Sequence, residues 1–312
     1  MITKVSTLNM PHEEWLSIRR KTIGGSDAGA ILGLNQYRSA YSLWAEKTGV
    51  LIPDDISDKE AVRLGHDLEQ YVADRFMEVT GKKVRRDNNI IYNSLYPWAH
   101  ANIDRSVIGE DAGLECKVTS SWEILKQCQE GKYPDSWYCQ IVHYMAITGA
   151  KKWYLGVLCL GKGFYWFEIE CNSDEISALM AAERNFMENV TNNIPPAVDG
   201  SESTDTALKT IFAESTSREI DLTAVSNHIQ MHMALSKQIK ELETAKAQHE
   251  AEIKTYMRDA GKGSYGNVSV SWKTQSRNIF NREKFEATHG AIPETFFKVS
   301  TSRPFRVTVK EI

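Results

Sequence analysis

The spacing of apolar residues changes its period several times along the first two thirds of the chain. Between Lys59 and Thr80 apolar residues recur every three or four positions, the period of a helix with one buried face, and Gly81 supplies a C-terminal stop. Shorter apolar segments bounded by Asn, Gly and Asp are typical of strands. The predicted helices are 11–23, 26–32, 40–47, 59–80, 121–129, 135–148 and 173–191, and the predicted strands are 83–92, 98–108, 113–119, 152–160 and 164–170. This order predicts an α/β core with a mixed sheet.

A different pattern occupies the last third of the chain. Segment 199–206 is rich in Ser, Thr and acidic residues and is expected to be a linker. Across 220–260 the three-and-four spacing continues almost without interruption, which predicts one helix of about 60 Å or a helical hairpin. Two alternating segments predict a small terminal sheet, 268–272 and 305–309. We therefore expect a domain of residues 1–200 and a C-terminal extension of residues 201–312, a long helix followed by a basic β segment.

Composition limits the class of protein. The chain has 312 residues, of which 42% are hydrophobic and 25% are charged, so it can bury an ordinary globular core. We find no apolar run of the roughly 18 residues that a membrane span requires, and no signal-peptide pattern at the N-terminus. The five cysteines form no CxxC pair, which favours reduced thiols. These features predict a soluble protein of the cytoplasm.

The charge of the chain is distributed unevenly. The formal net charge of −4 argues against a polycation that coats nucleic acid. However, residues 266–312 contain eight basic and four acidic residues, a local net charge of +4. A DNA enzyme that gathers carboxylates around metal ions can be acidic overall and still present a local basic surface. The net charge therefore does not exclude duplex DNA as the substrate.

The residues best suited to catalysis lie around a predicted hairpin turn at 109–113. Such a turn places Asp104 and Glu115 on neighbouring strands, and the two-residue strand period puts Glu115 and Lys117 on one face. Mg²⁺ and Mn²⁺ prefer carboxylate ligands, while an ammonium group can orient a water and stabilise charge on a phosphate. The pattern favours metal-assisted phosphodiester hydrolysis. The alternative is a solvated charged face, against which the apolar neighbours in both strands argue.

Five short motifs occur in a fixed order along residues 11–200. They are Trp15-x-x-x-Arg19, Ile23-Gly24-Gly25-Ser26-Asp27, Gly65-x-x-x-Glu69, Asp104 with Glu115-x-Lys117, and Gln140-x-x-x-Tyr144. Together they resemble the phage-type exonucleases of the YqaJ and lambda exonuclease group, within the PD-(D/E)xK nuclease superfamily. The chain departs from the family pattern at Ile103, where a proline is usual before the aspartate. The resemblance implies a restriction-endonuclease-like mixed-sheet core flanked by helices.

The resemblance also implies a metal site. Asp104 and Glu115 would be catalytic metal ligands, and the backbone carbonyl of Cys116 would be a further ligand because it lies between the site residues. Lys117 would contact the nucleophilic water or the scissile phosphate, with a strand-edge salt bridge as its alternative role. Glu69, on a helix face where an exposed acid is ordinary, would be a catalytic residue that ligates a second metal directly or through water. The implied cofactor is Mg²⁺, for which Mn²⁺ can substitute.

A second group of residues is expected to bind DNA at a 5′-phosphate. A serine at a helix N-terminus with an arginine nearby suits a phosphate, and the family assigns this role to Arg19, Ser26 and Gln140. Arg20 is the alternative to Arg19, because only the spacing in the first motif separates them. Ser26 is also expected to be the N-cap of its helix. Tyr144 shares a helix face with Gln140 and is a further DNA-binding candidate, with core packing as its alternative role.

The expected activity is that of a Mg²⁺-dependent 5′-to-3′ exonuclease. It would digest the ends of linear double-stranded DNA and leave 3′ single strands for phage-type homologous recombination. Resemblance alone implies the direction, a ring-shaped homotrimer, a single-strand annealing partner of the RecT or Beta type, and a phage or prophage origin in a bacterial cytoplasm. The alternatives are another PD-(D/E)xK nuclease, structure-specific or restriction-like, and a noncatalytic DNA-binding or assembly module.

Overall fold

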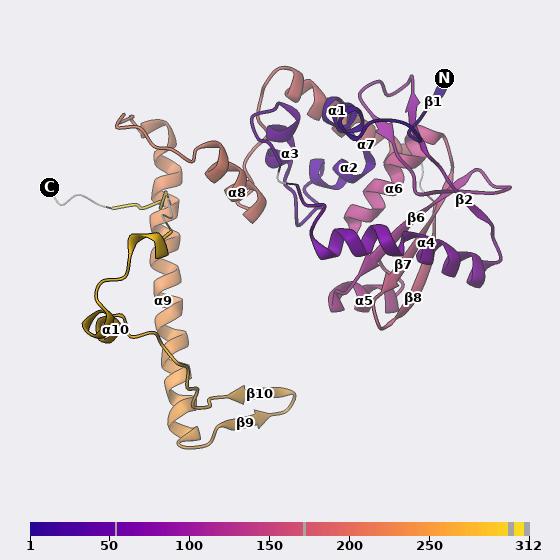
Figure 1. The fold of residues 1–312 in the computed structure, drawn as a ribbon. Helices are drawn as coiled ribbons and strands as arrows, with labels where there is room; N and C mark the ends of the chain where they lie inside the picture. The colour runs from indigo at the N-terminus through magenta and orange to yellow at the C-terminus, as the bar shows by residue number, and fades with distance from the viewer. Residues whose placement is uncertain (54, 171–172, 299–302, 309–312) are drawn as a thin grey trace. The chain divides into compact units, whose positions relative to one another are not determined.

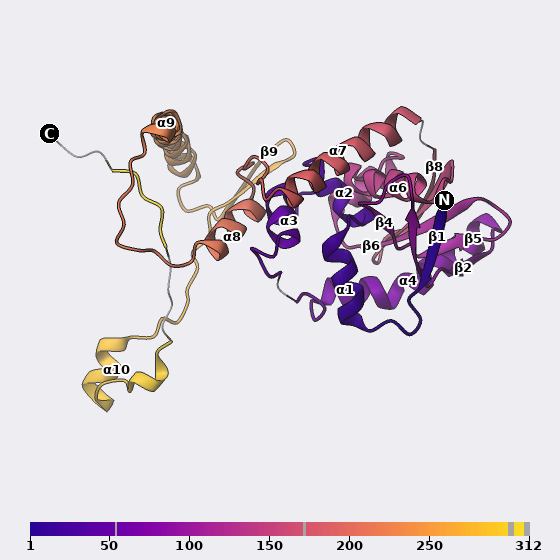
Figure 2. The same cartoon turned by 90° about the horizontal axis from the view of Figure 1, so that it is seen from above.

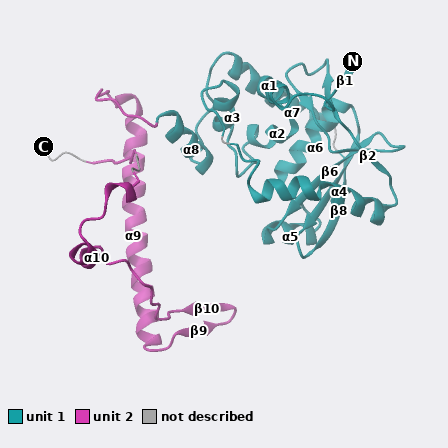
Figure 3. Cartoon of the chain, in the orientation of Figure 1, with its two compact units in different colours: residues 1–212 teal, residues 213–312 magenta. Residues whose placement is uncertain are grey.

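A five-stranded mixed sheet forms the centre of the first of two structural units. The computed structural model describes four stretches of the chain, residues 1–53, 55–170, 173–298 and 303–308. The units are Met1–Phe212 and Ala213–Ile312 (Figures 1 and 3). The boundary falls later than the expected division at residue 200, because one further helix packs onto the first unit.

The central sheet has the strand order β2-β5-β6-β7-β8. Its strands are β2 (Val84–Arg86), β5 (Arg105–Val107), β6 (Ala112–Thr119), β7 (Lys152–Cys159) and β8 (Gly163–Glu170). β6 and β7 run parallel, whereas the other neighbours run antiparallel. The predicted α/β core with a mixed sheet is therefore confirmed. The predicted hairpin turn also connects β5 to β6.

A second sheet contains residues that the sequence pattern assigns differently. Its strands are, in spatial order, β1 (Ile2–Ser6), β3 (Asn89–Asn93) and β4 (His100–Ala101). The predicted strands 83–92 and 98–108 are each divided between the two sheets. Asp87 lies at the first division, where its carboxylate accepts hydrogen bonds from Lys4 at 3.0 Å and Ser106 at 2.9 Å. The pattern does not predict β1, because all its residues are exposed and it lacks a buried face.

Helices cover both faces of the central sheet. α4 (Glu60–Thr80) crosses one face and α6 (Asp135–Thr148) packs on the other (Figure 1). Because side chains alternate along β6, Leu114 packs into the core under α4, whereas Glu115 faces α6. α4 ends as predicted at Gly81, which has a left-handed conformation. Two further predicted helices are present, α5 (Trp122–Gln129) and α7 (Ser173–Thr191).

Three short helices precede α4. They are α1 (His12–Lys21), α2 (Gly25–Ile31) and α3 (Ala40–Lys47). α2 packs directly on α6 (Figure 2). A Cβ atom on Gly25 would lie 2.6 Å from a ring carbon of Tyr144, and one on Gly29 would lie 2.9 Å from Cβ of Ser136. The two glycines therefore permit the close approach of α2 to the face of α6 that carries Tyr144.

The expected N-cap of α2 is wrong. Gly24 is the N-cap, and Ser26 is already inside the helix. The buried carboxylate of Asp27 accepts a hydrogen bond from the Gly24 N–H at 3.1 Å, which satisfies a donor at the helix start. The Ser26 hydroxyl is not needed for capping and is exposed.

Segment 199–206 is not the linker that its composition predicts. It contains the start of α8 (Glu202–Ile211), whose N-cap Ser201 accepts a hydrogen bond through its side chain. The Thr204 hydroxyl donates to the Ser39 hydroxyl at 2.8 Å, which joins α8 to the start of α3. The hydroxyl residues therefore cap and attach a helix, and the first unit includes that helix.

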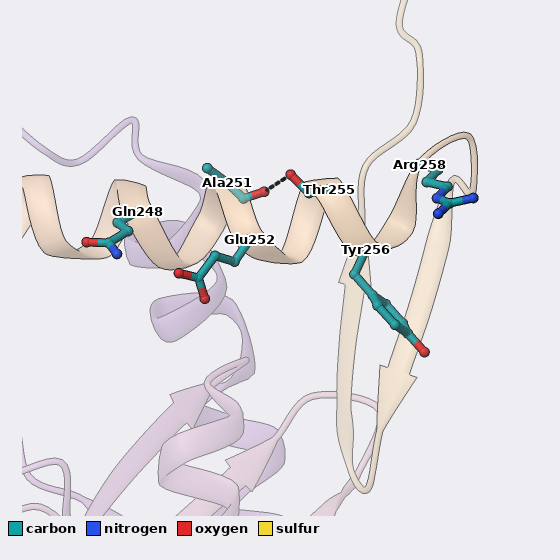
Figure 4. A pocket seen from close by; sticks show the side chains of 6 residues that line it. All are labelled: Gln248, Ala251, Glu252, Thr255, Tyr256 and Arg258. Atoms are coloured by element: carbon teal, nitrogen blue, oxygen red, sulfur yellow. Dashed lines mark hydrogen bonds between the residues drawn. The ribbon is translucent and has the colours of Figure 1, made fainter.

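The second unit is built around one long helix. α9 (Ser226–Met257) is continuous over 32 residues, so it is shorter than the predicted segment 220–260 and does not fold back as a hairpin. Its last turns line an open pocket around Glu252 and Tyr256 (Figure 4). None of the helices in the described part of the chain combines the length and apolar character that a membrane span requires.

The predicted terminal sheet is present only in part. An antiparallel hairpin pairs β9 (Lys262–Tyr265) with β10 (Val268–Ser271). Residues 305–308 are not in a strand, so the expectation of a strand there is wrong, and Val309 lies outside the described residues. The pattern also does not predict α10 (Arg282–His289), a short helix with no buried residue.

Candidate active site

The hairpin of β5 and β6 opens beside the predicted acids. The strands pair at Arg105 with Leu114, and the pairing does not continue toward Asp104. Instead, Oδ2 of Asp104 accepts a hydrogen bond from the Cys116 N–H at 2.8 Å. A carboxylate thus takes the place of a backbone carbonyl in the ladder. Because the N–H and C=O groups of one strand residue point to the same side, the Cys116 carbonyl also faces this open edge.

Glu115 and Lys117 lie on the same face of β6, as the strand period predicts. Nζ of Lys117 is 2.7 Å from Oε1 of Glu115. Gln140 of α6 joins the two side chains: its Nε2 donates to Oε1 of Glu115 at 2.8 Å, and its Oε1 accepts from Lys117 at 2.9 Å. Nε2 of Gln140 also lies 2.7 Å from the hydroxyl of buried Tyr144. The four side chains form one continuous polar network.

The network leaves negative charge only partly compensated. Glu115 is 3% exposed, and within the described residues its buried Oε2 has no hydrogen-bond partner. Burial and the nearby Glu115 carboxylate raise the pKa of Asp104 well above its usual value. Burial and the same two carboxylates raise the pKa of the Tyr144 hydroxyl. Two acids are thus close together in a desolvated position, where a cation would lower the electrostatic energy.

Glu69 is not brought together with Glu115. It lies on α4, on the face of the sheet that contains Arg105, and its Oε1 forms ion pairs with Arg105 and, at 3.2 Å, with Arg86. The Glu69 charge still contributes to the raised pKa of Asp104, so the two carboxylates are near each other. The geometry therefore places Glu69 beside the open edge, paired with arginines.

The donor set at the open edge suits a hard divalent cation in its chemistry. Within the described residues, no three side chains of His, Cys, Asp or Glu are arranged as a ready ligand set. Asp104 and Glu115 supply two carboxylates, and the Cys116 carbonyl supplies a neutral oxygen on the same edge. The unpartnered Oε2 of Glu115 is the observation that favours such a ligand. These three groups could hold Mg²⁺ or Mn²⁺.

Arg19 and Ser26 are in direct contact. Nη2 of Arg19 donates to Oγ of Ser26 at 3.0 Å, and the guanidinium lies 4.6 Å from the ring centroid of Trp15. Trp15 thus shares a helix face with Arg19, whereas Arg20 is exposed. The geometry favours Arg19 over Arg20 as the partner of Ser26.

The sequence pattern assigns no role to the ion pairs of Asp27, the residue that follows Ser26. The Asp27 carboxylate is buried and lies 2.8 Å from Nζ of Lys47 and 2.7 Å from the guanidinium of Arg38. Burial alone would raise the pKa of Asp27, but Lys47 and Arg38 hold it below its usual range. An acid between the apolar residues of α2 could have signalled a buried partner, because an unpaired buried charge is costly. The sequence does not reveal which cation pairs with it.

His143 has a structural role between elements of the first unit. It is fully buried, and its Nδ1 lies 2.7 Å from Oε1 of Glu183 on α7. Its Nε2 lies 2.8 Å from the carbonyl oxygen of His100. Burial would lower the pKa of His143, but the Glu183 carboxylate raises it above its usual value. The residue ties α6 to α7 and to β4.

A mixed sheet flanked by helices, with Asp104 and Glu115-x-Lys117 beside its open edge, defines the PD-(D/E)xK class of fold. The family model of the YqaJ-like viral recombinase domain matches residues 14–151. The chain is 38% identical over 309 residues to the "Uncharacterized protein YqaJ" of Bacillus subtilis strain 168, covering 97% of this chain and 95% of that relative. The chain belongs to the YqaJ-like family.

Solved structures support the assignment of the fold. An alkaline exonuclease, LHK-Exo, from Laribacter hongkongensis is 19% identical, with a TM-score of 0.50 over 58% of this chain and 94% of that chain. The same enzyme in complex with dAMP gives a TM-score of 0.51 at the same identity and coverage. The alignment with both structures therefore covers only part of this chain.

Proposed function

We propose that the chain is a metal-dependent deoxyribonuclease that digests linear double-stranded DNA from its 5′ ends. The observation that carries the proposal is the Asp104, Glu115, Lys117 and Gln140 arrangement at the open edge of β5 and β6. Family membership and the likeness to an alkaline exonuclease agree with it. The remaining 3′ strand would serve homologous recombination.

Asp104, Glu115 and the Cys116 carbonyl would hold Mg²⁺, with Mn²⁺ as a substitute. When bound, the metal supplies an activated water and stabilises charge on the phosphate. The chain's own contribution is to fix the acids: Asp104 is oriented by the Cys116 N–H, and Glu115 by Gln140. Glu69, already paired with Arg105, would act from beside the site through a water or a second metal.

Lys117 has a defined part in this proposal. Its ammonium donates to Gln140 and Glu115, and an ammonium has three protons. The third proton can be donated to the scissile phosphate or to the attacking water. Gln140, in contrast, uses both ends of its amide inside the network. We therefore propose that it orients Glu115 and Lys117, and that the 5′-phosphate binds to Arg19 and Ser26, with Tyr144 supporting Gln140.

The experiment that tests the proposal is digestion of end-labelled linear duplex compared with covalently closed circular DNA. We expect Mg²⁺-dependent shortening of the linear duplex from 5′ ends, no cutting of the circle, and loss of activity in EDTA. Robust cutting of the circle would support an endonuclease of the same fold instead. Binding without digestion at any Mg²⁺ or Mn²⁺ concentration would support a noncatalytic DNA-binding module.

The assembly and the partner are separate parts of the proposal. Family resemblance supports a ring-shaped trimer and a single-strand annealing protein of the RecT or Beta type. Light scattering of the full chain at several concentrations tests the trimer, and a mass that remains that of a monomer contradicts it. Co-purification of the chain with an annealing protein of the RecT or Beta type tests the partner, with the Glu115→Gln variant as a control that separates binding from catalysis.

A further inference from the structure

A buried lysine joins the two helix ends that carry Arg19 and Ser26. Lys47 is the last residue of α3, and its side chain is 5% exposed. Its Nζ donates to the carbonyl of Arg19 at 2.5 Å, to the carbonyl of Thr22 at 2.8 Å and to Oδ2 of Asp27 at 2.8 Å. All three protons of the ammonium are thus used inside the protein, so Lys47 is not itself a phosphate ligand.

The pair of Lys47 and Asp27 satisfies both helix ends at once. The Arg19 and Thr22 carbonyls belong to the C-terminal turn of α1, where orphan acceptors remain, and Lys47 caps them. Asp27 accepts from the Gly24 N–H at the N-terminus of α2. A cation at a helix C-terminus and an anion at a helix N-terminus are both favourable. The ion pair therefore fixes α1 and α2 relative to each other.

This fixed geometry sets the contact between Arg19 and Ser26. The carbonyl of Arg19 accepts a hydrogen bond from Lys47, and the guanidinium of Arg19 donates one to Ser26 at 3.0 Å. Ser26 in turn precedes Asp27 in α2. Without Lys47, the end of α1 would lose two hydrogen bonds and the link through Lys47 to Asp27 of α2. The guanidinium and the hydroxyl would then no longer be held together before a ligand arrives.

We propose that Lys47 is a positioning residue that sets the preference for a 5′-phosphate by holding Arg19 and Ser26 in place. This inference rests on the proposed function, in which Arg19 and Ser26 bind the 5′-phosphate. Arg38 provides a matched comparison, because it pairs with the same Asp27 carboxylate at 2.7 Å but its hydrogen bonds go to Asp27 and Glu46, not to α1. A purely stabilising role of the cluster predicts the same outcome for both cations.

The test measures kcat/KM on linear duplexes that carry either a 5′-phosphate or a 5′-hydroxyl, for wild type, Lys47→Met and Arg38→Met. We expect Lys47→Met to lower the phosphate preference about tenfold, which is less than the roughly 10²-fold cost of a 1 Å misplacement at reacting atoms. Activity on the 5′-hydroxyl duplex should change less than about twofold, which shows that the catalytic groups are intact. Arg38→Met should keep the wild-type preference. Arg19→Ala gives the preference that remains without the phosphate contact.

The outcomes separate this inference from the proposed function. If wild type digests DNA without any preference for a 5′-phosphate, the proposed phosphate site is wrong, and the role of Lys47 is wrong with it. Wild-type preference that persists in Lys47→Met, or that falls equally in Arg38→Met, overturns the role of Lys47 alone. If Lys47→Met does not fold, the double variant Lys47→Met with Asp27→Asn removes both buried charges. It should fold and show the same loss, and its failure to fold assigns the pair a stabilising role only.

Discussion

Asp27 and Glu115 are equally buried acids with very different surroundings. Each has 3% of its surface exposed. Both oxygens of Asp27 accept hydrogen bonds, from Lys47, Arg38 and the Gly24 N–H. Oε1 of Glu115 contacts Lys117 and Gln140, but Oε2 has no partner within the described residues. One carboxylate is fully satisfied by the fold, whereas the other is only half satisfied.

The difference separates charges that stabilise the fold from charges that serve a ligand. Lys47 and Arg38 hold the pKa of Asp27 below its usual range, so its ionised form favours folding. Next to Glu115, burial and the Glu115 charge raise the pKa of Asp104, so these acids cost stability when both are ionised. A protein retains such a cost where a function requires it. Substitution of Asp27 should therefore affect mainly stability, whereas substitution of Glu115 should affect mainly activity.

The largest effect is expected from Glu115→Gln. Loss of a metal-binding carboxylate should remove several kcal/mol of transition-state stabilisation, or about 10³-fold in the rate of digestion. The free energy of unfolding should stay the same or rise, because repulsion with Asp104 is removed. Single-turnover digestion and urea unfolding measure the two quantities.

The control for this change is Glu110→Gln, in the turn of the same hairpin. Glu110 pairs with Lys82 and Lys152 away from the open edge, so its digestion rate should remain within about twofold of wild type. Wild-type activity in Glu115→Gln would refute the assignment of the site.

Asp27→Asn should lower the free energy of unfolding instead. Removing one partner of a buried pair leaves the Lys47 charge uncompensated, which costs about 3 kcal/mol of unfolding free energy. Urea unfolding at neutral pH measures the loss. Asp67→Asn, on the exposed face of α4, should change stability by no more than about 0.5 kcal/mol. A loss below about 1 kcal/mol in Asp27→Asn would mean that the cluster is not a main source of stability.

Gln140→Ala tests whether the amide orients the catalytic groups. It removes hydrogen bonds to two charged side chains, each worth about 1.5–3 kcal/mol, so digestion should slow about 10- to 100-fold. Gln129→Ala, at the exposed end of α5, is the matched control and should digest DNA at the wild-type rate. A change confined to the ratio of 5′-phosphate to 5′-hydroxyl rates would instead indicate that Gln140 contacts the terminal phosphate.

His100 extends the comparison to a neutral buried group. Burial, followed by the nearby His143, lowers the pKa of His100 to about 3. An unfolded histidine titrates near pH 6.5, so below that pH the unfolded chain binds a proton that the folded chain does not. As the pH is lowered from 6.5 to about 3, the free energy of unfolding should therefore decrease, with a slope approaching about 1.4 kcal/mol per pH unit.

The measurement is urea unfolding of wild type and His100→Gln at pH 7.5, 6 and 5. The contribution of His100 is the difference between the two slopes, and it should vanish above about pH 7.5. His66→Gln, on an exposed face of α4, should keep the wild-type slope. Equal slopes in wild type and His100→Gln would show that His100 is not held neutral by the fold.

The spacing of apolar residues predicts a helix or strand correctly where nearby residues in the sequence determine its ends. α4 ends at Gly81, and α7 has the bounds that its apolar spacing predicts, because both depend on residues within the helix. The division of strand 83–92 depends on Asp87, whose partners Lys4 and Ser106 come from other parts of the chain. Contacts of this kind have no signal in the spacing of one segment.

The candidate site also combines features that local pattern predicts with features that depend on tertiary packing. The strand period alone places Glu115 and Lys117 on one face, and the hairpin turn brings Asp104 beside them. The approach of Gln140 depends on how α6 packs on the sheet, so the sequence could offer only a resemblance for its role. The pairing of Glu69 with Arg105 across α4 and β5 likewise follows from tertiary packing.

The contact between Gly25 and Tyr144 has a consequence for the divergence of related chains. A Cβ atom at position 25 would lie 2.6 Å from the tyrosine ring, so position 25 cannot gain a side chain while position 144 keeps its tyrosine in place. Relatives with alanine at position 25 should carry a side chain smaller than tyrosine at position 144. The two positions, far apart in the sequence, are expected to vary together, and an alignment of many relatives should reveal them as a coupled pair.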